Sequence, residues 1–386
     1  MDALLTEEGR RLRAEARAFA RERIRPVADE LDQTATYPQD ALEACGERRW
    51  TGLTLPEPHG LGKGYVDLAV LTEELAAASM PVASALNLHL GAAQLLATHG
   101  TDAQRERWLP GLARFETVAA LGLSEDEAGS DKSGMTTTAE RDADRWVLDG
   151  HKRWVTNYHQ ADLVLTYART GDRADWPGGV TAFLVDADAF TLDREWDTLG
   201  ARPVPACRVV LDGVQVGDDR RVGPIGEGYR GRSAVANGIN VPARGVGIAR
   251  AALADTAAHT SEREQGGAPL ADRQGLRWEL AAMARRLDRA RLATLSAADQ
   301  ADRGRDAARA MAVAKLEATE AAVDNANDAV QLHGGIGYTR ERSVERYLRD
   351  AKLLTIAGGP NAGHRDALAE QVLAEPVRPV DDGRNP

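Results

Sequence analysis

The segment HKRWVTN, residues 151–157, carries an aromatic and a hydroxyl side chain at alternate positions. On a β-strand, Trp154 and Thr156 face the same side of the sheet. A flat indole beside a hydroxyl suits a planar heteroaromatic ring, although a tryptophan on a strand is more often part of a core. We therefore take this pair as a candidate contact for a ring-shaped cofactor.

The segment LGLSEDEAGSDKSG, residues 121–134, is rich in small and hydroxyl residues. Ser124, Gly129 and Ser130 can bring backbone N–H groups and hydroxyls close to a polar or phosphorylated ligand. The alternative is an ordinary capped loop that binds nothing.

Two glycine-rich turns lie near the C-terminus. The first, in QLHGGIGYTRERSVERYLRDAKL (331–353), follows a long helix and could admit a nucleotide. It lacks a Gly-x-Gly-x-x-Gly arrangement after a strand, so a Rossmann site is not indicated. The second, in LLTIAGGPNAGHRD (353–366), has no acidic residue between Asp350 and Asp366, so it offers no carboxylate base.

The hydrophobic periodicity of the sequence divides the chain into three parts. These parts must position the segments described above. Residues 1–118 have the period of helices, including TDAQRERWLPGLA, which opens at a Thr/Asp N-cap and which we expect Pro110 to interrupt. Over 119–230, alternating or short β-branched runs between Gly, Asp and Pro predict a compact antiparallel β-domain. Long Ala/Leu/Arg segments over 231–372 predict a helical bundle, and the tail 373–386 is predicted to be disordered.

Composition narrows the functional class. The chain has 386 residues and a net charge of −11, which argues against a nucleic-acid partner. No run approaches the ~18 apolar residues of a membrane span, and the charged N-terminal residues do not resemble a signal peptide. We therefore expect a cytoplasmic protein with no membrane and no metal. Cys45 and Cys207 are expected to be reduced thiols rather than a disulfide.

Taken together and in this order, these segments resemble the acyl-CoA dehydrogenase family over nearly the whole chain. GHKRWVTN is similar to the family's Gly-x-Lys-x-Trp-Ile-Thr-Asn strand, and SEDEAGSD to its Thr-Glu-Pro-x-Ala-Gly-Ser-Asp loop. REQGGAPLADRQ resembles its Arg-x-Gln-Phe-Gly-x-Pro-Ile segment, and QLHGGIGYTRERSVERYLRDAKLLTI matches the family signature almost residue for residue. The resemblance implies an α+β fold with an N-terminal α-helical domain, a central antiparallel β-domain and a C-terminal four-helix bundle. It also implies FAD and a homo-oligomer, either a dimer or a tetramer.

The resemblance assigns cofactor contacts in two groups. The flavin ring would be met by Leu121, Leu123, Ser124, Trp154 and Thr156, with Thr156 donating to the reactive N5 edge. Ser130 would lie near the FAD phosphates or the thioester arm. The ADP half of an FAD in the neighbouring subunit would be held by Arg263, Gln265, Gln274, Gln331, Gly334 and Gly335. Arginine suits a pyrophosphate, and glutamine amides suit an adenine edge.

The chain departs from the family at the catalytic base. The family's Glu, which removes the α-proton of the acyl thioester, is replaced by Gly358. Some members carry the Glu on a bundle helix instead, and that position is Asn237 here. The Arg that usually follows it, which contacts the CoA arm, is Gly238, and the Phe of the Arg-x-Gln-Phe-Gly segment is Gly266.

Two histidines are candidate substitutes for the base. His364 lies just past the turn, and His89 lies on a helix where the family lines its acyl pocket. Histidine has a suitable ordinary pKa, near ~6.5. The alternative for each is a surface histidine or one that is satisfied within its pocket.

These features support three hypotheses. The first is an FAD-dependent oxidoreductase with a non-standard base, acting on an acyl or hydroxyacyl thioester of CoA or an acyl-carrier protein. Its electron acceptor would be an electron-transfer partner or oxygen, and the use of this fold on carrier-bound hydroxyacyl groups suggests secondary metabolism. The second is a catalytically silent subunit of a hetero-oligomeric acyl-CoA dehydrogenase, against which the intact flavin-face segments argue. The third is a flavin monooxygenase of the same fold, which needs no α-proton base.

Overall fold

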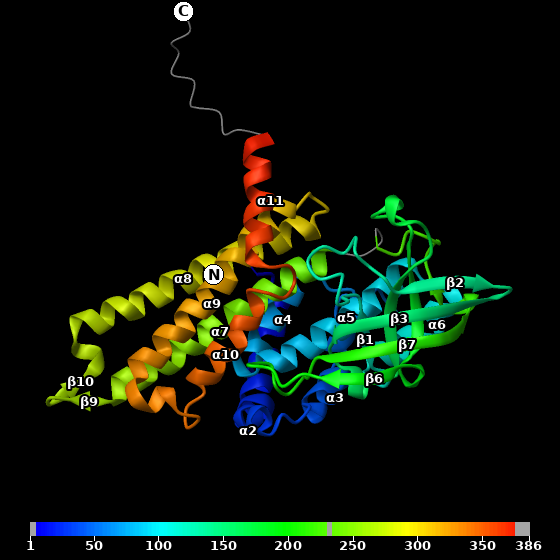
Figure 1. Ribbon diagram of the computed structural model, residues 1–386. Coiled ribbons are helices and arrows are strands. Elements are labelled where there is room, and N and C mark those ends of the chain that lie inside the picture. The colour runs from blue at the N-terminus through cyan, green and yellow to red at the C-terminus, as the bar shows by residue number, and fades with distance from the viewer. Residues whose placement is uncertain (1–4, 230–233, 375–386) are drawn as a thin grey trace, which may run out of the picture.

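The computed structural model of the chain describes residues 5–229 and 234–374. Three regions follow one another along the chain, and Figure 1 shows the helical bundle and the sheet on opposite sides of the molecule. The fold class expected from the sequence, helices then a β-domain then a helical bundle, is confirmed.

The first region is helical. Its α-helices are α1 (Glu7–Phe19), α2 (Ala28–Thr34), α3 (Gln39–Glu47), α4 (Tyr65–Ala78), α5 (Met80–His99) and α6 (Asp102–Ala113). Shorter turns are the π-helical η2 (Ala20–Ile24) and the 3₁₀ turns η3 (Arg25–Val27) and η4 (Trp50–Gly52). Helices α4 and α5 are buried along most of their length because they carry small and aliphatic residues on nearly all sides.

Helix α6 corrects one expectation. It begins at the Thr101 cap, where the Thr101 side chain accepts from Gln104 N–H and the Gln104 side chain accepts from Thr101 N–H. Pro110 does not interrupt it, because the helix continues to Ala113. Proline removes one N–H near the C-terminal end, while the buried Leu109 and Leu112 hold the last turn against the core.

The second region is an eight-stranded sheet with the order β6-β7-β3-β2-β4-β5-β8, with β1 paired to β4 outside this path. The strands are β1 (Ala119–Gly122), β2 (Thr138–Asp142), β3 (Arg145–Val155), β4 (Leu163–Arg169), β5 (Val180–Asp186), β6 (Thr191–Glu195), β7 (Cys207–Gly217) and β8 (Arg221–Val222). Short 3₁₀ turns lie between them: η5 (Tyr158–Gln160), η6 (Arg173–Asp175), η7 (Ala187–Ala189) and η8 (Asp218–Arg220).

The strand directions differ in one detail from the expected antiparallel domain. Most neighbours are antiparallel, but β1 and β2 both run parallel to β4. The chain leaves β1, passes through residues 123–137 and the hairpin β2–β3, and then returns as β4 in the direction of β1. The loop predicted to contact a ligand is therefore also part of a parallel connection.

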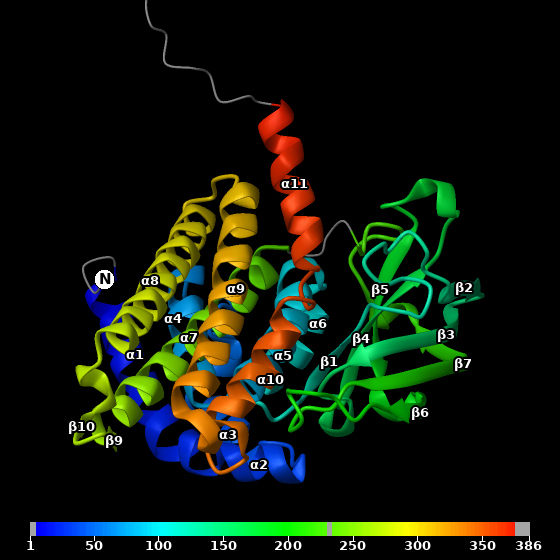
Figure 2. The same ribbon diagram turned by 60° about the vertical axis from the view of Figure 1, so that its left-hand side comes forward.

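The third region is the bundle. Its helices are α7 (Ala234–Glu262), α8 (Gln274–Asp302), α9 (Ala308–His333), α10 (Val344–Leu354) and α11 (Asn361–Ala374). Between them lie the hairpin β9 (Glu264–Gln265) and β10 (Ala268–Pro269), and the turns η9 (Leu270–Asp272) and η10 (Gly334–Tyr338). Helices α7, α8 and α9 pack on one another, and α10 and α11 pack on α9. Helix α11 projects from the bundle, as Figure 2 shows, and continues to Ala374, so residues 373 and 374 are helical rather than disordered. The rest of that predicted tail lies outside the described residues.

The core joins the first and third regions. Helix α4 packs on α7 and α8, and α5 contacts both α7 and β1. One large apolar cluster runs through these helices, and a second fills the sheet. Helix α5 therefore connects the β-domain to the bundle, as does α10, where Asp350 accepts from the Ala201 N–H.

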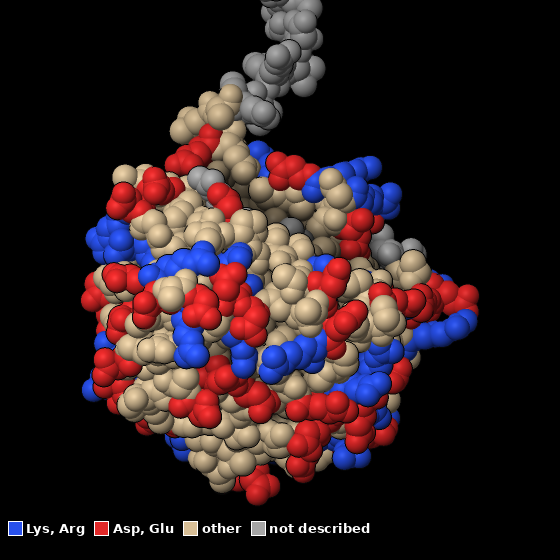
Figure 3. Space-filling view, turned by 90° about the vertical axis from the view of Figure 1, so that its right-hand side faces the viewer, with Lys and Arg blue, Asp and Glu red and all other residues tan. Residues whose placement is uncertain are grey.

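Two further expectations from the sequence can be compared with the structure. Cys45 and Cys207 are buried free thiols, as predicted, and burial raises the pKa of each to about 12. Among the described residues, no helix has the length and apolar character needed to cross a membrane. On the face drawn in Figure 3, Lys and Arg side chains are interspersed with Asp and Glu over the β-domain. The absence of a nucleic-acid partner stays a prediction.

Candidate active site

Trp154 is held in an unusual backbone conformation at the end of β3. Its φ is +59°, in the left-handed region that large side chains rarely adopt, and 46% of the residue is exposed. The ring lies 4.3 Å from Trp196, centroid to centroid, and the Arg153 guanidinium lies 4.5 Å from the ring centroid. An exposed aromatic residue in a strained backbone is typical of a ligand contact, because such strain persists only where surrounding structure imposes it.

Thr156 follows in a turn rather than on the strand. Strand β3 ends at Val155, so the strand geometry that we expected for Trp154 and Thr156 does not extend to Thr156. Burial still alternates here, because Val155 is buried while Trp154 and Thr156 are both accessible. The turn is fixed by Asn157, whose Nδ2 donates to Ala85 O of α5 at 2.9 Å.

The ligand loop is anchored by a buried ion pair that the sequence analysis missed. Glu125 Oε1 lies 2.5 Å from Lys152 Nζ, and neither side chain is exposed. The other carboxylate oxygen, Oε2, accepts from the Thr136 N–H at 2.5 Å and the Thr136 hydroxyl at 2.7 Å. Burial acts to raise the pKa of Glu125, but Lys152 and these hydrogen bonds outweigh it and lower the pKa to about 2. The only signal in the sequence was the first of the three acidic residues of SEDEAG and the lysine of GHKRW, which lie 27 residues apart.

The same anchor brings two predicted groups of residues together. Arg153 N–H donates to Ser124 O at 2.8 Å, so the loop runs beside the end of β3 that carries Trp154. Leu121, Leu123 and Ser124 are half-buried along this path. The Ser124 hydroxyl accepts from Lys132 Nζ at 2.8 Å, which places a second missed residue, a cation, in the loop. Ser130 is exposed farther along it.

The residues assigned to the ADP half of FAD lie at the far end of the molecule. The set is fully exposed and comprises Arg263, Gln265, Gln274, Gln331, Gly334 and Gly335. It surrounds the β9–β10 hairpin and the end of α9, which Figures 1 and 2 show on the side of the bundle away from the sheet. One chain therefore does not bring the two groups together, and their joint role at one cofactor stays a prediction that requires a second chain.

Gly266 has a local structural reason for replacing the family's phenylalanine. Gly266 and Gly267 both have positive φ, +62° and +82°, between the paired residues Gln265 and Ala268. Two central residues with positive φ are typical of a tight hairpin turn, and a bulky side chain there is strained.

The turn at Gly358 contains no carboxylate. Gly358 has φ +70°, and a Cβ built on it would lie 2.8 Å from Val241 Cγ2 and 3.9 Å from Lys315 Cε. A side chain at this position would therefore point between α7 and α9. The alternative base position, Asn237, lies in the first turn of α7, and its side chain lies outside the described residues. At Gly238, a Cβ would meet Met311 Sδ at 2.4 Å, so Met311 fills the space beside the missing arginine.

Basic groups surround this turn. Lys315 Nζ is buried and donates to Leu354 O at 2.7 Å and Asn361 Oδ1 at 2.9 Å. Burial and the nearby charge of Arg244 lower the pKa of Lys315 to about 8. His364 Nε2 lies 3.1 Å from Gly358 O. Burial lowers the pKa of His364 below its usual 6.5, which the bond to Gly358 O opposes and the charge of Lys315 reinforces.

The two candidate histidines have different environments. His89 is fully buried, its Nε2 lies 2.8 Å from Leu112 O, and its Nδ1 accepts from Ala119 N–H at 3.1 Å. Burial lowers the pKa of His89 to about 4. Both ring nitrogens therefore hold the start of β1 and the end of α6, which argues against His89 as a base. His364 is half-buried at the turn and remains a candidate.

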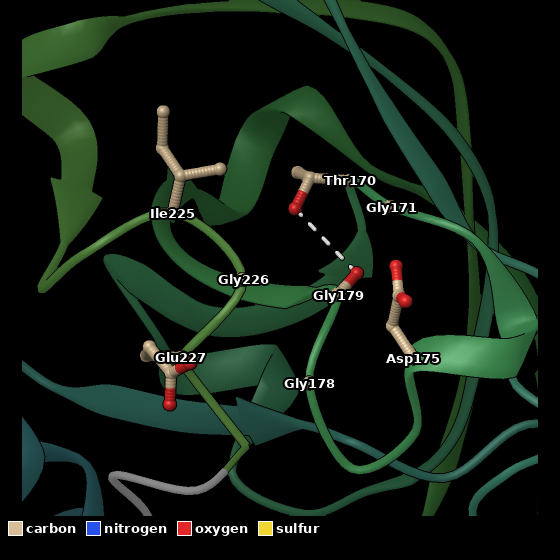
Figure 4. Close-up of a pocket in the computed structure, with 8 residues that line it drawn as sticks. All are labelled: Thr170, Gly171, Asp175, Gly178, Gly179, Ile225, Gly226 and Glu227. Atoms are coloured by element: carbon tan, nitrogen blue, oxygen red, sulfur yellow. Dashed lines mark hydrogen bonds between the residues drawn. The ribbon is translucent and has the colours of Figure 1, made fainter.

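The structure shows two further groups of residues. Figure 4 shows a hollow lined by Thr170, Gly171, Asp175, Gly178, Gly179, Ile225, Gly226 and Glu227, none of which was assigned from the sequence. His159, Glu195 and Cys207 bring potential metal-ligand atoms within 4.8 Å of one another in the sheet. The expectation that the protein needs no metal stays a prediction.

Comparisons with known proteins find relatives over the whole chain. Family models match in order: Acyl-CoA dehydrogenase, N-terminal domain, at residues 6–116; middle domain at 120–214; and C-terminal domain at 236–373. The probable acyl-CoA dehydrogenase YngJ of Bacillus subtilis is 35% identical, covering 97% of this chain and 100% of that protein. The 3-sulfinopropanoyl-CoA desulfinase of Paraburkholderia xenovorans is 36% identical, covering 96% and 97%. The structure of butyryl-CoA dehydrogenase from Megasphaera elsdenii superposes with a TM-score of 0.92 at 29% identity, covering 96% of this chain and 99% of that one.

Proposed function

The chain belongs to the acyl-CoA dehydrogenase family of FAD-dependent oxidoreductases, and we propose that it oxidises an acyl or hydroxyacyl thioester of CoA or an acyl-carrier protein without a carboxylate base. The observation that carries this proposal is a contrast within the site. The two segments assigned to the flavin are joined by the Glu125–Lys152 pair, whereas the turn at Gly358 has no carboxylate and a side chain built there would lie beside the Lys315 side chain.

The residues present fit a flavin. Trp154 offers an accessible aromatic face, and the half-buried Leu121 and Leu123 lie along the neighbouring loop. The accessible Thr156 is a hydroxyl donor held by the Asn157 contact to α5. FAD, when bound, supplies the hydride acceptor. The protein side chains shield the ring from water and fix its orientation.

A proton must leave the substrate along with the hydride. From a saturated acyl group it leaves the α-carbon, whereas from a hydroxyacyl group it leaves an oxygen. We propose His364 as its acceptor, because a lowered pKa keeps the imidazole neutral near pH 7. If Nε2 carries the proton that is donated to Gly358 O, then Nδ1 has the free lone pair.

One relative supports a substrate other than a simple saturated chain. The desulfinase acts, by its name, on a thioester whose acyl group ends in a sulfinate. We further propose a homodimer or homotetramer, because the second group of FAD contacts lies at the opposite end of each chain. The electron acceptor is an electron-transfer partner or oxygen.

Anaerobic flavin reduction tests the proposal. The purified holoprotein should be yellow, and 3-hydroxyacyl thioesters, offered on CoA or on a phosphopantetheine carrier, should bleach the flavin faster than saturated acyl-CoA of equal length. Rapid bleaching by butyryl-CoA would show that an efficient α-proton base is present after all. A protein that folds but binds no FAD would favour the silent subunit. A reduced flavin that oxygen reoxidises rapidly with hydroxylation of a substrate would favour the monooxygenase.

A further inference from the structure

Arg244, on α7, is a buried cation without a carboxylate partner among the described residues. Only 5% of the residue is exposed. Its Nη1 donates to the Ser84 hydroxyl of α5 at 2.7 Å, and its Nε donates to Asn240 O at 3.3 Å. Burial lowers the pKa of Arg244 to about 10, so the side chain is still charged at neutral pH. A buried guanidinium with only neutral acceptors is costly, because burial removes the water that would otherwise solvate its charge.

Other buried or largely buried arginines among the described residues have carboxylate partners. The described residues bury one other arginine, Arg346, which is 3% exposed and donates to Asp29 at 2.7 Å. Arg291, which is largely buried, pairs with Glu73 at 2.6 Å. Arg349 pairs with Asp32 at 2.5 Å. Arg244 is thus an exception to a rule that this protein otherwise follows, and such an exception calls for an anion from outside the chain.

Arg244 also lies beside the turn at Gly358. Its Nε contact to Asn240 O places the Arg244 side chain beside the preceding turn of α7, the turn that also carries Val241. Val241 in turn is the residue that a Cβ at Gly358 would contact. The charge of Arg244 also acts on Lys315, whose Cε would lie 3.9 Å from a Cβ at Gly358. The acidic group that acts on Lys315 is Glu320, and Glu320 is itself paired with Arg365 at 2.6 Å.

We propose that Arg244 and Ser84 bind a terminal oxyanion, a carboxylate or sulfinate, at the far end of the substrate's acyl group. This inference rests on the proposed thioester function and names the substrate class within it. The planar guanidinium matches a carboxylate or sulfinate through paired N–H donors, and the Ser84 hydroxyl supplies another donor. Lys315 adds positive charge nearby while its Nζ keeps the hydrogen bonds to Leu354 O and Asn361 Oδ1.

The spacing limits the length of the acyl group. Val241 and Arg244 are three residues apart on α7, a rise of ~4.5 Å. A chain that passes the Gly358 turn therefore reaches the guanidinium within a few carbon–carbon bonds. Acyl groups of about four or five carbons with a terminal oxyanion fit this span, and long saturated chains do not.

Binding to the FAD-loaded protein tests this. The probes are butyryl-CoA, succinyl-CoA and 3-sulfinopropanoyl-CoA, which share a short chain and differ at its end. Their Kd values are measured by isothermal titration and by perturbation of the flavin spectrum. Loss of charge-assisted hydrogen bonds corresponds to about 10- to 100-fold in affinity, so the anionic thioesters should bind that much more tightly than butyryl-CoA. The two anionic probes separate a carboxylate site from a sulfinate site.

Variants of Arg244 and Ser84 test whether these residues cause the preference for anionic thioesters. Arg244→Gln should lower the ratio of butyryl-CoA to succinyl-CoA Kd values to near one, and Ser84→Ala should lower this ratio partly. Arg23→Gln removes a charge from an exposed position on η2 and should leave the ratio as in the wild type. Equal affinity of the wild type for neutral and anionic chains overturns the inference, as does a preference that persists in folded Arg244→Gln. If Arg244→Gln does not fold, an unchanged ratio in Ser84→Ala is decisive against it. If butyryl-CoA binds as tightly as the anionic thioesters, only this inference is wrong. If no thioester binds, the proposed function is wrong as well.

Discussion

Glu125 and Lys152 form a fully buried ion pair that joins the loop after β1 to strand β3, with 2.5 Å between Oε1 and Nζ. The loop carries Ser124, and β3 carries Trp154. The pair therefore fixes the two segments assigned to the flavin relative to each other. A charge pair buried in a sheet has little reason to exist for stability alone, because desolvation offsets most of its attraction.

Breaking this pair should destabilise the protein strongly. Lys152→Met leaves the Glu125 carboxylate buried without its cation, which typically costs about 3–5 kcal/mol of unfolding free energy. Denaturant unfolding of the FAD-free protein measures the loss. The double variant Glu125→Gln/Lys152→Met removes both charges and should recover part of it. An unchanged unfolding free energy in Lys152→Met would show that Glu125 and Lys152 do not form an ion pair in solution.

The same pair should give a specific pH dependence. The pKa of Glu125 is lowered from 4.5 to about 2, so its contribution to stability is complete above the unfolded-state value and is lost as the pH falls from about 4.5 to 2. The stability difference between wild type and Glu125→Gln/Lys152→Met, which removes both charges, should therefore shrink as the pH falls below about 4.5. Unfolding titrations at each pH measure it, and a difference that stays constant to pH 3 would contradict the assignment.

The two groups of FAD contacts predict complementation between chains. Trp154→Ala disables the flavin end, and Arg263→Ala disables the ADP end, where one charge-assisted contact contributes about 1.5–3 kcal/mol. Each variant alone should lose FAD on gel filtration while its helical content is kept. Because one FAD would use residues of two chains, co-expressed variants should form mixed oligomers that regain a fraction of the FAD. Full retention of FAD by Arg263→Ala would remove this segment from the site.

Much of this arrangement could be predicted from the sequence. The change from helical to strand periodicity and back predicts the three regions, the residue types around Trp154 indicate a ring contact, and the family resemblance identifies Gly358 as the position of the missing base. The first two are local properties, since each depends on residues within a few positions of one another. The fold class could be predicted because the periodicity is a local property and because the family resemblance extends over nearly the whole chain.

The parts that were missed depend on contacts between distant segments. Glu125 and Lys152 are 27 residues apart, and neither residue type alone indicates burial. Arg244 lies in an Ala-, Gly- and Val-rich helix where a single arginine is expected to reach solvent. Its isolation from carboxylates becomes visible only when α5, α7 and α9 are packed together. The choice between His89 as a base and His89 as a histidine satisfied within its pocket likewise depends on distant segments, because its two backbone partners come from α6 and β1.

His364 should control the acid side of the pH–rate profile. Its pKa lies below the ordinary 6.5, so the neutral, proton-accepting form is present at pH 7 and is lost as the pH falls through that lower value. His364→Ala should lower the rate of flavin reduction by about 10²–10⁴-fold and abolish this limb of the profile. His89→Gln is the matched comparison, and it should affect stability more than the profile. A wild-type profile that persists in His364→Ala would identify another base.

Gly358→Glu should restore α-proton removal only when room is made for the side chain. A Cβ at this position meets Val241 Cγ2 at 2.8 Å, and the backbone at φ +70° adds strain of about 1–3 kcal/mol for any residue but glycine. Val241→Ala removes the clashing methyl groups, so the double variant Gly358→Glu/Val241→Ala should gain activity that Gly358→Glu alone lacks.

The gain should stay well below the ~10²–10⁴-fold that a well-placed base provides, because the strained backbone and Pro360 limit how the side chain is aimed. Anaerobic flavin reduction by a short acyl-CoA panel measures it. Gly358→Gln/Val241→Ala has the same shape without the carboxylate and should remain inactive. A carboxylate at Gly358 would also lie beside Lys315, and the attraction between them should lower the carboxyl pKa and weaken the base. Adding Lys315→Met should therefore raise the rate further if the variant stays folded. A double variant that binds FAD yet reduces it no faster than its glutamine control would show that this turn does not face the acyl chain.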